Sequence, residues 1–323
     1  MGGGSWTNTA YVTHSTVTRG FSNMDDFMSA STSQLYKATK MNPDMDPKGV
    51  IRECCDSDEH PNSLPVILAL DVTGSMGSAA STVAKKLGDI MSDIFKANVD
   101  RDVEFCVMAI GDQEYDGCPY QVSQFESDIR IAEALEKIYF EGCGGGNDSE
   151  SYVGAWLWAN ERTKCDCWSH NGRGILITMG DECPTPRITD RFKNIMGTLD
   201  KDIYTQFPIK TTSDLYNEIS KKWNIYHISI DDPSSSYSRY KVSMDVDKKW
   251  KDLIGQNYMV STINKLPDTI SNIIIDHVEA EHSCYEYADE GHFDGGSSVE
   301  PEVVTGVDMI GGVQTNENGE VVW

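Results

Sequence analysis

The chain has 323 residues and a formal net charge of −24 at pH 7, with 27 Lys and Arg against 51 Asp and Glu. This charge argues against a nucleic-acid partner, because phosphate backbones are bound through clustered Lys and Arg. No stretch approaches the ~20 apolar residues that a membrane-spanning helix needs, so we expect no membrane partner.

The first ten residues, MGGGSWTNTA, lack the basic start and the apolar stretch of a signal peptide. They also miss the myristoylation pattern, because Trp6 stands where Ser or Thr is required. We therefore expect a cytoplasmic protein, alone or within a larger assembly. In that compartment the nine cysteines are expected as free thiols. Cys165, Cys167 and His170 suggest zinc, but they lack the second ligand pair of a zinc ribbon, so a mobile surface loop is predicted instead.

Three regions differ in their sequence pattern. Residues 1–62 are rich in Ser, Thr, Asn and Met, and we expect an extended arm with one helix near 25–41. If this arm is a docking element, its deletion should remove an interaction without unfolding the rest. Residues 63–281 are predicted as the main domain. Residues 282–323 are an acidic tail without Lys or Arg, in which Asn318-Gly319 predicts a hairpin turn.

The main domain alternates apolar strands with amphipathic helices, which is typical of an α/β fold. We expect a doubly wound, mostly parallel six-stranded sheet with helices on both faces. The predicted strands are 65–70, a strand through 105–110, an edge strand near 120–125, 175–179, 225–230 and 258–261, and the predicted helices are 79–96, 128–140, 151–163 and 267–281. Ligand sites of such sheets lie outside the carboxyl ends of the strands.

Two details of these elements carry further expectations. His227 lies inside a predicted strand and is expected to be packed or hydrogen-bonded rather than catalytic. Trp156 and Trp158 cannot both face inward from one side of a helix, so we expect one of them to be exposed.

Side chains with oxygen donors lie in three loops at the carboxyl edge of the predicted sheet. Asp71, Thr73 and Ser75 alternate at the end of the first strand, so that their oxygens can converge. The loop G-G-G-N-D-S-E supplies Asn147, Asp148 and Glu150. The loop I-T-M-G-D-E-C-P supplies Asp181, which comes directly after a buried strand. Single acids at such places commonly cap helices and turns. Together, the carboxylates and hydroxyls predict a site for Mg²⁺ or Mn²⁺.

These three loops resemble those of the von Willebrand factor type A family. Its metal-ion-dependent adhesion site follows D-x-S/T-x-S, which Asp71, Thr73 and Ser75 match, and DVTGSMG resembles the D-x-T-G-S-M branch common among intracellular members. That branch often carries G-G-G-D-x-P-E in the second loop and G-D-A-P-P in the third. Gly111-Asp112 resembles a further Asp-bearing loop of the branch.

The resemblance covers about two-thirds of the chain and implies a non-enzymatic, metal-dependent module for protein–protein interaction. Asp71, Thr73 and Ser75 would hold Mg²⁺ or Mn²⁺ directly or through water, with Glu150 and Asp181 completing the shell. Further candidate ligands are Asp148, Asn147 and Asp112. A protein partner would supply an acidic side chain to the open position of the metal. The second loop departs from the family by having Asn147 in place of the Asp, which leaves its ligand open.

Two enzymatic alternatives use some of the same residues. A haloacid-dehalogenase-like phosphotransferase would take Asp71 as nucleophile, Asp181 as magnesium ligand and Thr73 to orient the phosphoryl group. It would leave the G-G-G-N-D-S-E loop without a role, and it usually needs an Asp where Thr185 stands. A serine hydrolase requires G-x-S-x-G, whose first glycine is replaced here by Thr73.

Overall fold

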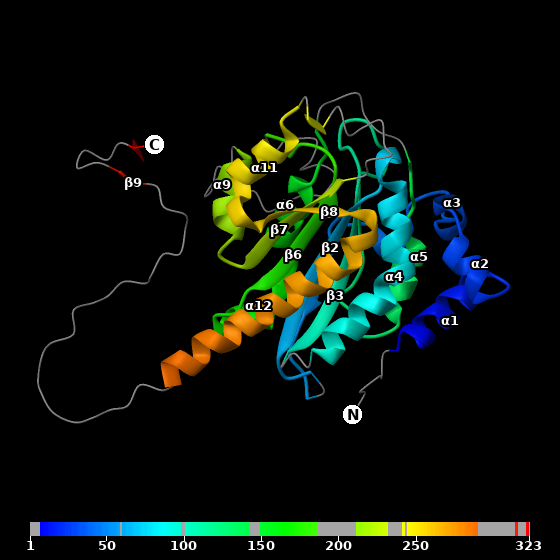
Figure 1. The fold of residues 1–323 in the computed structure, drawn as a ribbon, viewed down its shortest axis with the longest axis horizontal. Helices are drawn as coiled ribbons and strands as arrows, with labels where there is room; N and C mark the ends of the chain where they lie inside the picture. The colour runs from blue at the N-terminus through cyan, green and yellow to red at the C-terminus, as the bar shows by residue number, and fades with distance from the viewer. Residues whose placement is uncertain are drawn as a thin grey trace, which may run out of the picture. The chain divides into compact units, whose positions relative to one another are not determined.

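The computed structural model describes residues 7–58, 60–97, 101–142, 149–186, 211–231, 241–242 and 244–289, together with the residue pairs 314–315 and 321–322 (Figure 1). The chain divides into two compact units, Met1–Ala280 and Glu281–Trp323. None of the described helices is both long enough and apolar enough to span a bilayer.

A six-stranded sheet forms the centre of the first unit. Its strands lie in the order β4-β3-β2-β6-β7-β8. All neighbours are parallel except β4, which pairs antiparallel with β3 at one edge. The bounds are β2 (Ser63–Asp71), β3 (Asp102–Ile110), β4 (Tyr120–Val122), β6 (Gly174–Gly180), β7 (Trp223–Asp231) and β8 (Tyr258–Thr262). The α/β class and the mostly parallel six-stranded sheet are confirmed, and the antiparallel edge strand makes the sheet mixed.

Helices cover both faces of this sheet (Figure 1). Successive residues of β2 point to opposite faces, so Leu68 and Leu70 belong to one hydrophobic cluster and Ile67 and Ala69 to the other. The first cluster includes α4 (Gly77–Lys96), α5 (Arg130–Lys137) and α12 (Leu266–Asp289), and the second includes α6 (Val153–Arg162), α9 (Thr212–Ile219) and α11 (Val246–Ile254). Burial on both faces explains why the central strands are continuous apolar runs.

The expectation that one tryptophan of α6 is exposed is wrong. Trp156 and Trp158 are both fully buried. The reason is that α6 is enclosed, since it contacts the sheet at β3 and is also packed against α9 and the short strand β5 (Thr163–Cys165). A helix with neighbours on several sides buries residues all round.

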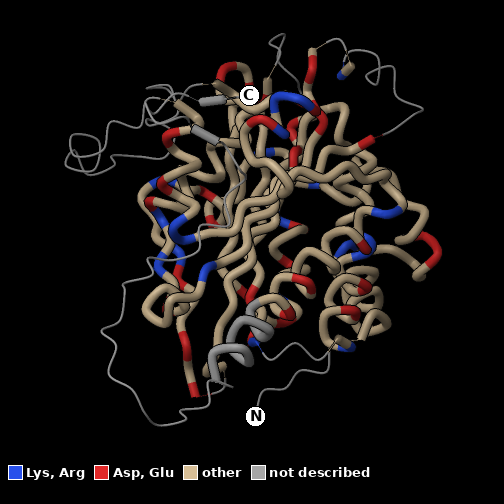
Figure 2. Tube along the Cα trace, turned by 60° about the vertical axis from the view of Figure 1, so that its left-hand side comes forward, with Lys and Arg blue, Asp and Glu red and all other residues tan. Residues whose placement is uncertain are grey.

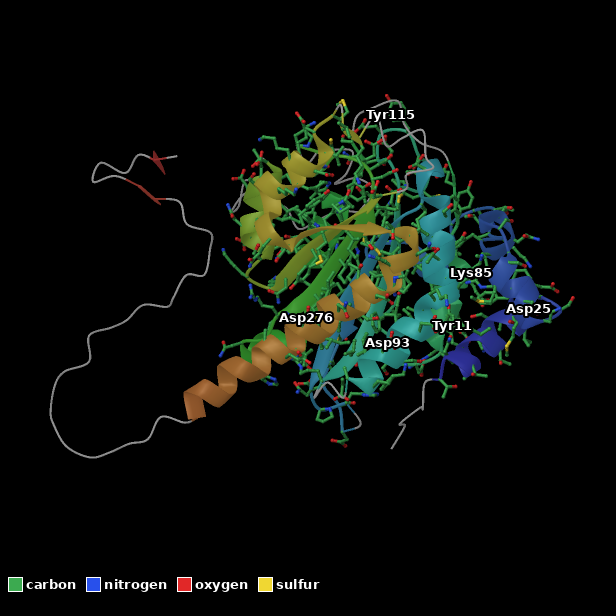
Figure 3. The ribbon with its side chains drawn as sticks, in the orientation of Figure 1. Tyr11, Asp25, Lys85, Asp93, Tyr115 and Asp276 are labelled. Carbon is green, nitrogen blue, oxygen red and sulfur yellow. The ribbon has the colours of Figure 1, made fainter. Side chains whose placement is uncertain are left out.

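The N-terminal region forms helices rather than an extended arm. It contains α1 (Asn8–Thr18), α2 (Met24–Ser29), α3 (Thr32–Leu35) and the 3₁₀ turn η1 (Pro43–Met45). Figure 3 places Tyr11 between α1 and α4, and its hydroxyl donates to the carbonyl of Ala84 at 2.5 Å. Tyr11 and Phe27 belong to the same hydrophobic cluster as β2. The sequence pattern missed α1 because only a few of its residues are apolar.

The mobile surface loop predicted for Cys165, Cys167 and His170 is also wrong. It forms β5, which pairs in parallel with β1 (Arg52–Cys54), followed by the 3₁₀ helix η3 (Asp166–His170). The pairing sets Cys54 opposite Cys165, and these two side chains and that of Cys167 are buried. The cysteines whose side chains are described are free thiols, as expected.

The remaining described elements are short. The 3₁₀ helices η2 (Gly74–Met76), η4 (Gly255–Asn257) and η5 (Ile263–Lys265) connect strands and helices of the first unit. In the second unit β9 (Gln314–Thr315) pairs antiparallel with β10 (Val321–Val322), the pairing that the predicted hairpin requires. The turn itself lies outside the described residues.

Candidate functional site

Loop one, which contains Thr73 and Ser75, leaves the carboxyl end of β2, one of the two central strands of the sheet. Asp71 is the last residue of this strand and its side chain is fully buried. Its Oδ1 accepts the backbone N–H of Thr73 at 2.8 Å and the Thr73 hydroxyl at 2.6 Å. This Asx-type turn directs the chain out of the strand and into η2. The oxygens of Asp71 and Thr73 therefore meet, as their spacing predicts.

Loop three, which contains Asp181, leaves the carboxyl end of β6. β6 lies beside β2, at the point where the chain changes from adding strands on one side of β2 to adding them on the other. Asp181 directly follows β6 and is 7% exposed. The hydroxyl of Ser75 in loop one donates to Asp181 Oδ1 at 3.2 Å. In sheets of this order the crevice outside the carboxyl ends at such a reversal is the usual ligand site. Loops one and three meet at that point.

Loop two brings Glu150 to the same edge. Its backbone N–H donates to the carbonyl of Cys183 at 3.2 Å, which ties loop two to loop three. The Glu150 side chain is buried, and its Oε2 has no hydrogen-bond partner in the described part of the chain. The candidates Asn147 and Asp148 lie outside the described residues.

Asp112, after β3, is held in a turn of its own. It is fully buried, and its Oδ1 accepts the backbone N–H of Glu114 at 2.7 Å. Its own N–H donates to Asp116 Oδ2 at 2.8 Å. The charge of Asp112 acts on Glu150, so this loop borders the site from the side of β3.

The pKa values of three buried acids at the site are raised. Burial raises the pKa of Asp71 to about 7, the charge of Asp181 adds to the increase, and hydrogen bonds from Thr73 and Tyr152 oppose it. Burial raises the pKa of Glu150 to about 10, with the charge of Asp71 as the next cause. Burial also raises the pKa of Asp181, against the opposing effects of the Ser75 hydrogen bond and the Lys241 charge. A positive charge among these groups would stabilise their ionised forms.

Tyr152 is a site residue that sequence reasoning missed. It is fully buried at the start of α6, and its hydroxyl donates to Asp71 Oδ2 at 2.6 Å. The same hydroxyl accepts the backbone N–H of Glu182 at 3.3 Å. The only signal in the sequence is its position two residues after Glu150.

Two further charged residues act on the site. Glu182 is buried directly after Asp181, and its charge contributes to the raised pKa of Glu150. Its adjacency to Asp181 is a signal that the sequence contains. Lys241 comes from the segment after β7, and no motif marks it.

The donor set suits a hard divalent cation in its chemistry. Asp71, Glu150 and Asp181 offer buried carboxylates, Thr73 and Ser75 offer hydroxyls, and the Oε2 of Glu150 has no hydrogen-bond partner among the described residues. Among the described residues, no three His, Cys, Asp or Glu side chains are grouped so that they could hold a metal ion between them. A cation would therefore need the hydroxyls as ligands, together with water.

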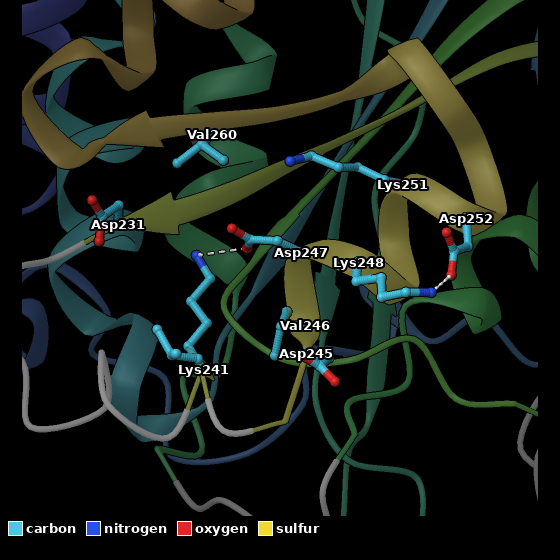
Figure 4. A pocket seen from close by; sticks show the side chains of 10 residues that line it. Asp231, Lys241, Asp245, Val246, Asp247, Lys248, Lys251, Asp252 and Val260 are labelled. Carbon is cyan, nitrogen blue, oxygen red and sulfur yellow. Dashed lines mark hydrogen bonds and ion pairs between the residues drawn. The ribbon is translucent and has the colours of Figure 1, made fainter.

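A cavity of about 590 Å³ lies beside β7 and β8 (Figure 4). It is lined by Asp231, Lys241, Val242, Asp245, Val246, Asp247, Lys248, Lys251, Asp252 and Val260. Two ion pairs lie in its lining, since Lys248 contacts Asp252 at 2.5 Å and Lys241 lies 4.0 Å from Asp247. Lys241 links this cavity to the site, because its charge also acts on Asp181.

The charged residues are mixed over the described surface. Figure 2 shows Lys and Arg positions in short stretches among Asp and Glu positions.

No protein-family model and no curated protein matches this sequence. Among solved structures, the open conformation of the pilus adhesin SpaC from Lactobacillus rhamnosus GG aligns with a TM-score of 0.42 and 13% identity over 72% of this chain and 31% of the adhesin. Proximal thread matrix protein 1 from the mussel byssus aligns with a TM-score of 0.39 and 10% identity over 67% of this chain and 46% of that protein. The chain thus spans less than half the length of either protein, and at these scores neither alignment identifies a family.

Proposed function

We propose that this chain is a divalent-metal-dependent protein-interaction module of the von Willebrand factor type A kind, with its site at the carboxyl edge of the sheet. The observation that carries the proposal is the meeting of three loops at the reversal of strand order. There Asp71 bonds Thr73, Ser75 bonds Asp181, and the buried Oε2 of Glu150 has no partner among the described residues.

Each of these residues has a distinct task in the proposed site. Asp71, Glu150 and Asp181 provide negative charge in a region with little water, where attraction to a cation is weakly screened. Thr73 and Ser75 now donate to carboxylates, and their oxygen lone pairs are available to a cation. Mg²⁺ or Mn²⁺ would supply an open position for an acidic side chain of a protein partner.

The phosphotransferase alternative is less well supported. A nucleophilic Asp71 needs space for a phosphoryl group beside its carboxylate, yet its side chain is fully buried. That alternative also gives Glu150 no role, although the charge of Asp71 raises the pKa of Glu150.

Calorimetric titration of Mg²⁺ and Mn²⁺ tests the proposal on the wild type, Asp71→Ala and Glu150→Ala. We expect the wild type to bind and both variants to lose at least about tenfold in affinity. The control is Asp93→Ala, which removes a 43% exposed carboxylate from α4 (Figure 3) and should leave binding unchanged.

Other outcomes separate the alternatives. Loss of binding in Asp71→Ala alone would favour the phosphotransferase, and hydrolysis of a phosphate ester by the wild type would then establish it. Absence of cation binding in the wild type would contradict the proposed function.

A further inference from the structure

The hydroxyl of Tyr152 lies directly on the carboxylate at the centre of the proposed site. We propose that Tyr152 is a positioning residue that leaves Asp71 one free oxygen lone pair and thereby makes the site selective for Mg²⁺ over Ca²⁺. This inference rests on the proposed function, because it concerns the same cation.

The orientation of the hydroxyl is fixed by a second hydrogen bond. The backbone N–H of Glu182 donates to the Tyr152 oxygen at 3.3 Å, and the hydroxyl donates to Asp71 Oδ2 at 2.6 Å. Because the Glu182 N–H uses a lone pair of the phenol oxygen, the phenol proton is directed to Asp71. Tyr152 therefore joins loop three to loop one through α6.

The ring is held in place on several sides. It packs edge-on against His227 at 5.1 Å and against Trp250 at 5.6 Å between ring centroids. On the side of β6 it passes over Gly180, where an added methyl group would overlap the Tyr152 hydroxyl. The absence of a side chain at Gly180 is therefore a requirement of this placement, and the hydroxyl has little freedom to withdraw from Asp71.

Counting lone pairs shows what this contact does. An ionised carboxylate has about four acceptor sites. Thr73 fills two on Oδ1 with its N–H and its hydroxyl, and Tyr152 fills one on Oδ2. With these hydrogen bonds from the described residues in place, Asp71 reaches a cation through Oδ2, as a single-oxygen ligand.

Single-oxygen coordination discriminates between cations. Ca²⁺ takes six to eight oxygens at flexible positions and commonly binds both oxygens of a carboxylate, whereas Mg²⁺ takes six in a strict octahedron and retains water. A carboxylate that is held to one free lone pair suits Mg²⁺. Tyr152 anchors Oδ2 and so keeps the carboxylate turned with Oδ1 on the two donors of Thr73. Without the Tyr152 hydroxyl the carboxylate can rotate away from Thr73 and present both oxygens to a cation, which favours Ca²⁺.

The test is Tyr152→Phe, titrated calorimetrically with Mg²⁺ alone and with Ca²⁺ alone. We expect the ratio of Mg²⁺ affinity to Ca²⁺ affinity to fall by about tenfold, the usual size of an effect from a group that orients a ligand. Gly180→Ala displaces the same hydroxyl without deleting it and should change the ratio in the same direction. The matched control is Tyr36→Phe, which removes a buried hydroxyl that donates to the Ala80 carbonyl at 2.9 Å, away from the site.

The outcomes separate this inference from the proposed function. An unchanged ratio of Mg²⁺ affinity to Ca²⁺ affinity in Tyr152→Phe, whether neither affinity changes or both change equally, overturns the role of Tyr152. The proposed cation binding stands in that case. If the wild type binds neither ion, the proposed function fails and the inference fails with it. Circular dichroism of each variant verifies that it is folded.

Discussion

At the scale of single residues, the most unusual feature is a carboxylate buried in the sheet among other acids. Asp71 has no exposed surface, and the charge of Asp181 acts on it. The hydrogen bonds from Thr73 and Tyr152 stabilise its ionised form, but they do not offset burial, so the pKa rises to about 7. Ionising Asp71 therefore costs folding free energy unless a cation compensates.

This cost predicts a pH dependence that Asp71→Asn should remove. The unfolded chain ionises Asp71 near the ordinary pKa of 3.8, but the folded chain does so near a pKa of about 7. The raised pKa stabilises the fold fully below the lower value, and that contribution is lost as pH rises to the upper one. The wild type loses this contribution as pH rises, whereas Asn at this position does not titrate. In EDTA, we therefore expect the difference in melting temperature, Asp71→Asn minus wild type, to increase by about 3 °C or more between about pH 4 and about pH 8.

Thermal unfolding by circular dichroism measures this difference. Saturating Mg²⁺ should stabilise the wild type more than the variant, and so reduce the difference at the upper pH. Melting temperatures that change in parallel with pH would show that Asp71 does not titrate in this range.

The candidate site was predictable where its contacts are local in sequence or follow from the ends of parallel strands. Asp71 and Thr73 are two residues apart, so the geometry of a strand end brings their oxygens together. The acids after β2 and β6 were predictable because parallel strands end at one edge. Tyr152 lies 81 residues from Asp71, and its contact depends on how α6 packs on the sheet. No spacing rule contains that information.

At the scale of secondary-structure elements, α1 and α4 approach unusually closely at Gly88. A Cβ atom at this position would lie 2.8 Å from the Tyr11 Cβ and 2.8 Å from Asn8 Oδ1. These distances are too short for carbon, so the packing of α1 on α4 requires glycine here. The glycine is unfavourable for the helix by itself, and the contact with α1 compensates.

Gly88→Ala is therefore expected to destabilise the protein. In an isolated helix the change is favourable by about 1 kcal/mol, but overpacking typically costs about 1–3 kcal/mol. We expect a net loss of about 1 kcal/mol in the free energy of unfolding, measured in a denaturant titration. Thr82→Ala is the control, because it raises helix propensity on α4 at a hydroxyl that bonds the Ser78 carbonyl at the surface. Stabilisation by Gly88→Ala would show that α1 does not pack as described.

At the scale of the whole molecule, predictability followed burial. The strands β2 and β6 are apolar throughout because both of their faces are covered, and such runs are easily recognised. The N-terminal helices were missed because few of their residues are apolar, so the pattern that marks an amphipathic helix is weak in α1. The two tryptophans of α6 were misjudged because the sequence does not reveal that a helix has neighbours on both sides.

The position of residues 1–62 changes what their deletion should do. Tyr11, Phe27, Leu35 and Met45 are nearly or fully inaccessible and pack in the same cluster as the sheet. Removing one large buried apolar side chain costs about 2–5 kcal/mol, and a domain has only about 5–15 kcal/mol in total. We therefore expect a chain that lacks residues 1–62 to lose its cooperative thermal transition. This expectation replaces that of an arm which can be removed without unfolding.

A truncation at the other end is the matched control. The α12 residues that the structure describes as buried, from Leu266 to Val278, belong to the first compact unit, which ends at Ala280. A chain that ends at Ala280 keeps the whole first compact unit, and we expect it to retain a cooperative thermal transition. Scanning calorimetry of both truncations measures the contrast. A cooperative transition in the chain without residues 1–62 would show that the sheet and its helices fold without α1 to α3, and that the cluster around Tyr11 is dispensable.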